Sequence, residues 1–194
     1  MPTNIAIFAS GSGSNALKIM EHFEKKPEVA SVRLLVASRA SIGALIHAEA
    51  HGVAHEVVTG RTLRENPEVL VELLDRHDIG FIALAGFLAM VPPAVTRRFA
   101  GRILNIHPSL LPAYGGKGMY GGRVHEAVLA DGCRESGMTI HQVNEVYDDG
   151  EIVHQSRVDI AADETPESLQ QKILKLEHHW YPRVIEAEIT KLNL

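Results

Sequence analysis

The stretch NIAIFASGSGSNALKIMEHFEK, residues 4–25, decides the fold because it joins three elements in a fixed order. Its apolar opening, residues 4–10, predicts a buried strand, and residues 16–25 predict a helix. Between them, Gly11 and Gly13 supply the backbone freedom by which a strand turns directly into a helix. A strand, a glycine turn and a helix in this order are typical of a sheet with parallel strands.

The alternation of strands and helices continues along the chain. Further strands are predicted over residues 32–38, 54–58, 79–85, 102–106, 138–143 and 152–158. Further helices are predicted over residues 42–51, 67–77 with Asn66 as N-cap, 93–99, 124–130 and 165–192, the last with Thr165 as N-cap and a kink or split at Pro182. The order predicts an α/β, Rossmann-like fold: a mostly parallel central sheet with helices on both faces, a β-rich C-terminal part and a long C-terminal helical segment. Ligands are expected beyond the carboxyl ends of the parallel strands.

The composition is that of one globular domain, expected to span residues 1–194. The net charge of −5 argues against a surface that binds nucleic acid or anionic membranes. Because Cys133 is the only cysteine, an intrachain disulfide and a CxxC motif are excluded. The first apolar run, residues 5–9, is too short for a signal-peptide core or a membrane span. We therefore expect a cytoplasmic protein.

The turn GSGSN, residues 11–15, is a candidate phosphate site. Free N–H groups and the helix dipole favour an anion where a glycine turn opens a helix. With Ala16 the spacing also satisfies the relaxed dinucleotide fingerprint GxGxxA, so an NADP-binding module is an alternative. The second predicted strand ends without the carboxylate that would hold NAD ribose, whereas Arg39 suits a 2′-phosphate. A merely tight turn is the third interpretation.

The run NIHPSLLP, residues 105–112, follows a predicted parallel strand. Side chains two apart on a strand share a face, so Asn105 and His107 can converge on one ligand. An Asn amide can donate to a developing oxyanion, and a histidine can move protons near neutral pH. This pair suits acyl chemistry. Alternatively, Asn105 caps a turn and His107 is a hydrogen-bonded loop residue.

Two further groups of polar residues allow weaker conclusions. The acidic turn at Asp148 and Asp149 is by itself ordinary, but a carboxylate brought near His107 would favour the imidazolium and raise the pKa, giving a general acid. His47 and His51 are spaced for metal binding, yet the glutamate between them is not placed as in HExxH. No metal site is expected.

Taken together, these motifs resemble the formyl transferase family, and within it the phosphoribosylglycinamide formyltransferases of purine synthesis. The resemblance is carried by GSGSN (11–15), LAGF (84–87), NIHPSLLP (105–112), the acidic turn before Gly150 and EHHWYP (177–182). It implies transfer of a formyl group from 10-formyltetrahydrofolate to the amine of 5-phosphoribosylglycinamide, by direct attack and without a covalent enzyme intermediate. A formyltetrahydrofolate deformylase, which is a hydrolase of the same fold, is the alternative.

The resemblance also implies roles for individual residues. Asn105 would stabilise the oxyanion, His107 would donate a proton, and Asp148 would orient His107 and raise its pKa. The nucleotide would be bound by Gly13, Ser14, Asn15 and Glu177. The folate would be bound by Arg64, Leu88, Ala89, Met90, Val91 and Asn105. Residues 1–100 would then form a nucleotide-binding half and residues 101–194 a folate and catalytic half, in a monomer or homodimer with small-molecule substrates.

The chain also departs from the pattern of its relatives. Ala89 stands where many relatives carry an arginine, which weakens the case for ionic contacts to the folate tail. The loop GGKGMYGG differs from the commoner form, so no role for Lys117 or Tyr120 follows from the resemblance. A cis bond between Leu111 and Pro112 is expected, as is typical of this run.

Overall fold

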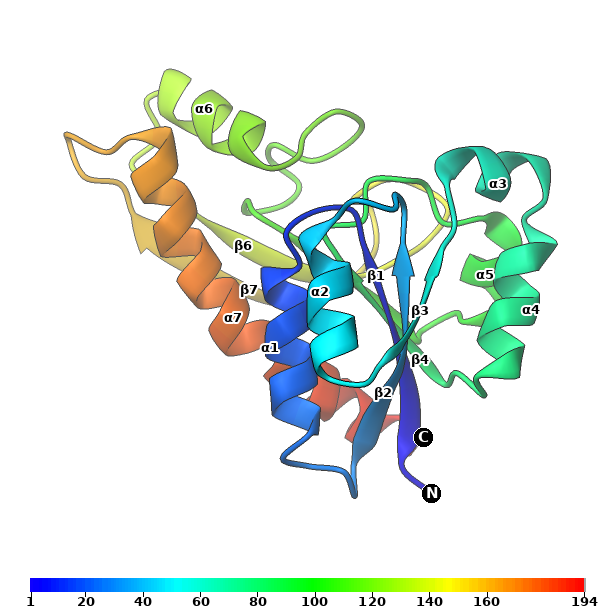
Figure 1. The fold of residues 1–194 in the computed structure, drawn as a ribbon. Coiled ribbons are helices and arrows are strands. Elements are labelled where there is room, and N and C mark those ends of the chain that lie inside the picture. The colour runs from blue at the N-terminus through cyan, green and yellow to red at the C-terminus, as the bar shows by residue number, and fades with distance from the viewer. Residues whose placement is uncertain (194) are drawn as a thin grey trace.

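One seven-stranded sheet organises the structure, a computed structural model that describes residues 1–193; Leu194, the last residue of the predicted domain, lies outside them (Figure 1). The strand order is β3-β2-β1-β4-β5-β6-β7. The strands are β1 Thr3–Ala9, β2 Ala30–Ala37, β3 Ala54–Val57, β4 Phe81–Ala85, β5 Ile103–His107, β6 Glu135–Gln142 and β7 Ile152–Asp159. Strands β1 to β5 pair in parallel, whereas β6 and β7 are antiparallel to their neighbours. The predicted fold class is confirmed.

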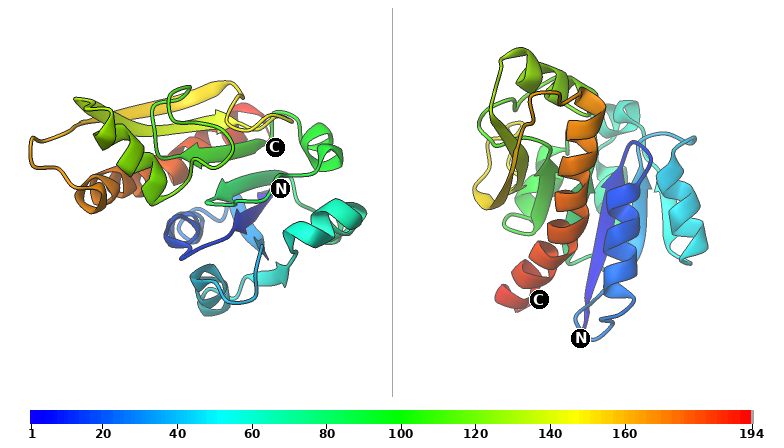
Figure 2. Two further views of the ribbon diagram at one scale, coloured as in Figure 1. Left: turned by 90° about the horizontal axis from the view of Figure 1, so that it is seen from above. Right: turned by 90° about the vertical axis from the view of Figure 1, so that its left-hand side faces the viewer.

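Helices cover both faces of the sheet (Figures 1 and 2). They are α1 Ser14–Phe23, α2 Gly43–Ala50, α3 Gly60–Glu65, α4 Glu68–Arg76, α5 Pro93–Arg98, α6 Gly122–Ala130 and α7 Pro166–Lys191. Buried side chains of α1, α2 and α7 belong to one hydrophobic cluster, and those of α4 and α5 to a second. The two clusters lie on opposite faces because β1 alternates between them: Ile5 and Ile7 belong to the first, Ala6 and Phe8 to the second.

Helix α7 begins where the sequence predicts but is not split. The Thr165 side chain accepts a hydrogen bond from the Ser168 N–H, and the Ser168 side chain accepts one from the Thr165 N–H, which completes a capping box. Of the kink or split predicted at Pro182, the split is wrong, since the helix continues to Lys191, and the kink stays a prediction. Pro182 is buried beside Tyr181, whose hydroxyl donates to the carbonyls of two strands, and this packing holds the helix through the missing N–H.

The prediction missed helix α3 and displaced the start of α4. Helix α3 was not predicted, because it has six residues of which only Leu63 is buried, too few to show a helical period. Its N-cap is Thr59, and Asn66 is its C-cap rather than the N-cap of the next helix. Helix α4 consequently begins at Glu68, with Pro67 as N-cap. Such shifts of one residue are common at helix ends.

The topology gathers the conspicuous motifs at one edge of the sheet. The GSGSN turn follows β1, residues 86–91 follow β4, and β5 ends at His107. Because these strands are parallel, their carboxyl ends lie together, on the upper side of the sheet in Figure 1. The pairing of β5 with β6 adds His141 directly opposite Asn105. The expected cis bond between Leu111 and Pro112 is present.

Candidate active site

A cleft of about 690 Å³ lies at the carboxyl edge of the sheet. It is lined by residues from both predicted halves of the chain, so the division of labour between the halves stays a prediction. The predicted site residues that line the cleft are Gly13, Ser14, Asn15, Leu88, Ala89, Met90, Val91, Asn105, His107, Asp148 and Glu177. Arg64 is not among the lining residues. The structure thus brings all but one of the predicted residues to one cavity.

His107 and Asp148 meet inside this cleft. The Nδ1 atom of His107 lies 3.6 Å from Oδ2 of Asp148. The Nε2 atom of the same ring lies 2.8 Å from the backbone carbonyl of Tyr114, which has only acceptor capacity, so Nε2 carries the hydrogen. Asp148 is fixed in turn by the Gly116 N–H, which donates to Oδ2 at 2.8 Å. Both imidazole nitrogens are therefore assigned to distinct partners.

Asn105, which is two residues before His107 on β5, completes this group of side chains. Its amide nitrogen lies 3.0 Å from Nε2 of His141 and donates to Oδ1 of Asp148 at 3.4 Å. His141 directs its other nitrogen, Nδ1, to the carbonyl of Gln142 at 2.8 Å. This arrangement makes His141 Nε2 the acceptor of the Asn105 amide. The side chains of Asn105, His107 and Asp148 thus surround one end of the cleft.

The protonation of His107 differs from the expectation. Burial lowers the pKa of this imidazole below its usual value, and the opposing effect of the Asp148 charge is smaller. The residue as a whole is only 4% exposed, which accounts for the size of the burial effect. The predicted net rise in the pKa is therefore wrong, although Asp148 acts in the predicted direction. In the free protein His107 is neutral at neutral pH.

Asp148 remains charged despite its partial burial. Burial alone would raise the pKa of its carboxyl, but contact with His141, the charge of His107 and the Gly116 N–H together lower it below the ordinary value. The backbone of Asp148 has a φ of 53°, a left-handed conformation that is unusual for a residue other than glycine. A charged carboxylate is consequently held against a neutral imidazole, with the two side chains 11% and 5% exposed.

The glycine turn has both a structural and a binding character. Gly13 has a φ of 81°, and a Cβ atom there would lie 2.4 Å from the Cα atom of Ala44, so only glycine fits against α2. Gly13 is also the N-cap of α1 and offers no side-chain cap to the first-turn N–H groups. Ser14 and Asn15, the first two residues of α1, line the cleft, and the N-terminus of a helix favours an anion.

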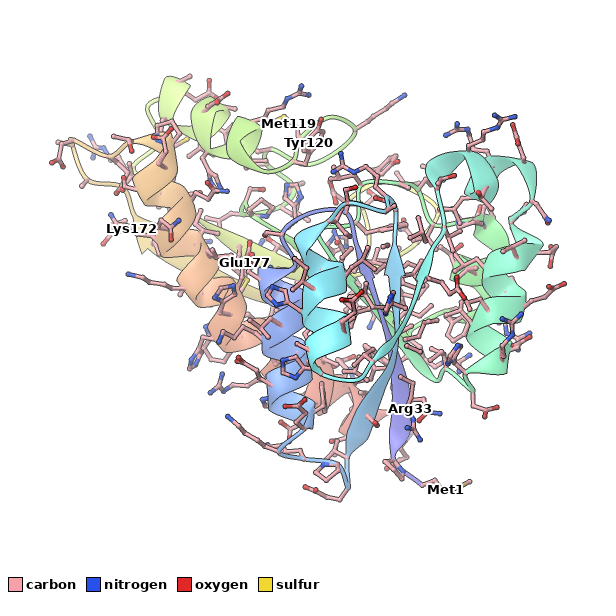
Figure 3. All side chains as sticks on the ribbon, in the orientation of Figure 1. Met1, Arg33, Met119, Tyr120, Lys172 and Glu177 are labelled. Atoms are coloured by element: carbon pink, nitrogen blue, oxygen red, sulfur yellow. The ribbon has the colours of Figure 1, made fainter. Side chains whose placement is uncertain are left out.

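Glu177 closes the cleft beside this turn. Figure 3 shows Glu177 on the side of α7 that faces α1. Its Oε2 atom accepts a hydrogen bond of 2.6 Å from the amide nitrogen of Asn15. Burial raises the pKa of this carboxyl to about 7, although the hydrogen bond from Asn15 lowers it. The pair joins two of the predicted nucleotide residues across 162 positions of sequence.

The segment after β4 forms an apolar wall of the cleft. Leu88 and Met90 are 46% and 47% exposed, so this wall presents two large apolar side chains to solvent. The backbone N–H of Leu88 donates to the Ser10 hydroxyl at 3.0 Å, which ties the wall to the glycine turn. Arg64 lies near Ala89 at the edge of this wall, since a Cβ atom placed on Gly60 would lie 3.6 Å from Nη1 of Arg64 and 3.9 Å from Cβ of Ala89.

Sequence reasoning missed four contributors to the site. His141 follows only from the register of β5 and β6, and Tyr114 and Gly116 act through backbone atoms that no motif identifies. His125 on α6 is 2% exposed and lines the same cleft, and its pKa is lowered by burial and by the nearby His107. The sequence offered a signal only for His141. This histidine lies on an alternating strand, β6, where it is opposite Asn105.

Metal-binding clusters and helices long and apolar enough to span a membrane are both absent from residues 1–193. No cluster of three or more His, Cys, Asp or Glu side chains is arranged to hold a metal ion in this range. Within the same range no helix combines the length and apolarity needed to cross a bilayer.

Comparisons with known proteins identify the family of this chain. The formyl transferase family model matches residues 3–185. A phosphoribosylglycinamide formyltransferase of Bacillus subtilis is 36% identical over 184 residues, which cover 93% of this chain and 92% of that protein. A chloroplastic enzyme of the same name from Arabidopsis thaliana is 43% identical over 94% of this chain. The chain spans 64% of that plant protein and 60% of its counterpart from Vigna unguiculata.

The similarity extends to the folded structure. The crystal structure of a phosphoribosylglycinamide formyltransferase from Bacillus halodurans superposes with a TM-score of 0.88 at 33% identity, covering 98% of this chain and 97% of that one. Because the family model matches residues 3–185, the chain belongs to the formyl transferase family.

Proposed function

We propose that the protein transfers the formyl group of 10-formyltetrahydrofolate to the amine of 5-phosphoribosylglycinamide in purine biosynthesis. The observation that carries the proposal is the meeting of Asn105, His107 and Asp148 in one cleft, with Nδ1 of His107 3.6 Å from the Asp148 carboxylate. The family membership supports the same reaction. The predicted cosubstrate and the residue roles are part of this proposal.

The neutral state of His107 determines the order of proton transfers. The substrate amine attacks the formyl carbon, a C–N bond forms, and the formyl oxygen becomes negative. The attacking nitrogen gives its surplus proton to Nδ1 of His107, the nitrogen without a hydrogen. The bond from the formyl carbon to N10 of the folate then breaks, and His107 returns the same proton to N10. Asp148 stabilises the imidazolium that exists between these two transfers.

Asn105 stabilises the negative oxygen of the intermediate. Its amide hydrogens are directed to His141 and Asp148 in the free protein, and the 3.4 Å contact with Asp148 is the longer of the two. We expect the hydrogen of this longer contact to turn to the formyl oxygen. An amide donor placed in this way typically accelerates acyl transfer by roughly 10² to 10³.

The two ends of the cleft suit the two substrates. The phosphate is expected at the glycine turn of Gly13, Ser14 and Asn15, with Glu177 accepting from the hydroxyl groups of the ribose. The folate is expected along the apolar wall of residues 88–91, with Arg64 at its edge. We further expect a cytoplasmic monomer or homodimer that acts on small molecules and needs no metal.

A product assay tests the proposal. The purified protein is incubated with 10-formyltetrahydrofolate, with and without the phosphoribosyl amine, and formate and the formylated amine are both measured. Formylated product that forms only when the amine is present is the expected result. Formate release that does not need the amine would replace the proposal with a deformylase. Tight NADP binding without folate binding would support an NADP module instead.

A further inference from the structure

The segment of residues 114–116 holds both His107 and Asp148 through hydrogen bonds of its backbone. The carbonyl of Tyr114 accepts the hydrogen of His107 Nε2 at 2.8 Å, and the N–H of Gly116 donates to Asp148 Oδ2 at 2.8 Å. These two contacts leave Nδ1 of His107 facing the carboxylate. The position of this segment therefore determines which imidazole nitrogen is free to exchange a proton.

The backbone of the segment is not in a conformation that it would keep unaided. Tyr114 has a φ of 56°, in the left-handed region that residues with a Cβ atom rarely adopt. Gly116 follows at a φ of 94°, which is open to glycine. Such a conformation persists only where surrounding contacts fix it. An anchor for Tyr114 is thus required.

The anchor is the tyrosine side chain, which lies outside the cleft. Tyr114 is not among the lining residues, and its hydroxyl donates to Oδ2 of Asp131 at 2.7 Å. The same hydroxyl lies 3.2 Å from the Sγ atom of Cys133. Asp131 and Cys133 follow directly on helix α6, so they are fixed by the body of the protein. Hydrogen bonds to Cys133 and Asp131 raise the pKa of the Tyr114 hydroxyl, which keeps it a donor throughout the physiological range.

We propose that the hydrogen bond from the Tyr114 hydroxyl to Asp131 is a positioning contact that selects the Nε2–H tautomer of His107. Neither residue touches the reacting atoms. Their effect passes through the Tyr114 carbonyl to His107 and leaves Nδ1 as the nitrogen that exchanges the proton. The consequence for catalysis rests on the proposed function, whereas the tautomer itself is a property of the free protein.

The first test is therefore spectroscopic and needs no substrate. The ¹⁵N shifts of the His107 ring are recorded at about pH 8, where the imidazole is neutral, for the wild type and for Tyr114→Phe, Asp131→Ala and Asp131→Asn. The wild type is expected to show the Nε2–H tautomer. Tyr114→Phe and Asp131→Ala should populate the Nδ1–H form, whereas Asp131→Asn, which keeps an acceptor oxygen, should resemble the wild type.

Kinetics of the same variants separate this inference from the proposed function. Tyr114→Phe and Asp131→Ala should lower kcat roughly three- to tenfold, the effect of one hydrogen bond, with KM values near those of the wild type. Asp131→Asn should restore kcat. A wild-type tautomer in a folded Tyr114→Phe or Asp131→Ala variant would overturn the positioning role, as would an Asp131→Asn variant as altered as Asp131→Ala. An altered tautomer in a protein without formyl transfer would contradict only the proposed function.

Discussion

His107 uses its two ring nitrogens for different tasks. Nε2 is committed to a backbone carbonyl, so the exchangeable position is Nδ1, which faces Asp148 at 3.6 Å. Burial lowers the pKa of His107 more than Asp148 raises it, which makes the ring a proton acceptor first and a donor afterwards. A neutral imidazole at rest also avoids a permanent ion pair that would compete with the substrate amine for the same carboxylate.

Removal of the His107 imidazole should slow the reaction. His107→Ala should lower kcat by roughly 10² to 10⁴, the range for a lost general acid–base group, while the circular dichroism spectrum stays unchanged. His55→Ala is the matched control, because His55 lies on the exposed edge strand β3, away from the cleft. A His107→Ala enzyme with a kcat close to that of the His55→Ala control would remove His107 from the chemistry.

Residue by residue, the sequence predicts what lies on one strand better than what comes from elsewhere. Asn105 and His107 share a face because they are two positions apart on β5, and their convergence follows from the strand period. Asp148 comes from a loop after β6, so its contact with His107 depends on the whole sheet. The roles of Tyr114 and Gly116 were not predictable, since every residue has the backbone groups through which they act.

Among the secondary-structure elements, helix α7 is anchored directly to β4 and β5, the strands that lead into the site. The hydroxyl of Tyr181 donates to the carbonyls of Leu84 at 3.0 Å and Leu104 at 2.9 Å, on β4 and β5. Tyr181 is completely buried, so both carbonyls would lack this partner without it. The same helix presents Glu177 to the cleft one turn earlier.

Loss of this hydroxyl should weaken the fold. Tyr181→Phe keeps the ring but leaves two buried carbonyls without the donor, which should lower the free energy of unfolding by about 1–3 kcal/mol. Urea denaturation measures the change. Tyr120→Phe removes a hydroxyl from a side chain that is 41% exposed and should change the same free energy much less. Equal stability of the two variants would mean that the Tyr181 hydroxyl does not anchor α7.

Helices and strands with many buried side chains were the easier ones to predict from the sequence. Strands β1 and β4 are almost entirely buried, and the almost continuous apolar run of residues 79–85 is typical of a strand covered on both faces. Strand β3 is exposed at all four positions, yet a strand was predicted there from the sequence pattern. Helix α3 escaped prediction because it has a single buried side chain. The continuity of α7 through Pro182 was not predictable because tertiary packing maintains it.

For the whole molecule, the buried Glu177 couples stability to pH. Burial raises its pKa from 4.5 to about 7, so the folded protein keeps a proton that the unfolded chain releases above pH 4.5. The unfolded state then binds fewer protons than the folded state, and stability falls as pH rises through this interval. The contribution of Glu177 is complete below pH 4.5 and is lost by a pH of about 7.

Substitution by the neutral amide should remove this dependence. Relative to the wild type, Glu177→Gln should gain about 3 kcal/mol in the free energy of unfolding between pH 4.5 and a pH above 7. Urea denaturation at both pH values gives the difference. Glu126→Gln changes an exposed carboxyl on α6 and should show no comparable trend. A pH-independent difference between Glu177→Gln and the wild type would show that Glu177 is not buried as a neutral acid.

The architecture as a whole brings Asn105 and His107 of β5 and Asp148 of the loop after β6 to one end of a single cleft. The single-turnover rate of formyl transfer in Asp148→Asn tests that arrangement most directly. With both substrates saturating, the rate should fall by roughly 10² to 10⁴ because the imidazolium loses its countercharge, while the affinities for nucleotide and folate stay near those of the wild type. A variant that transfers the formyl group at close to the wild-type rate would contradict the account.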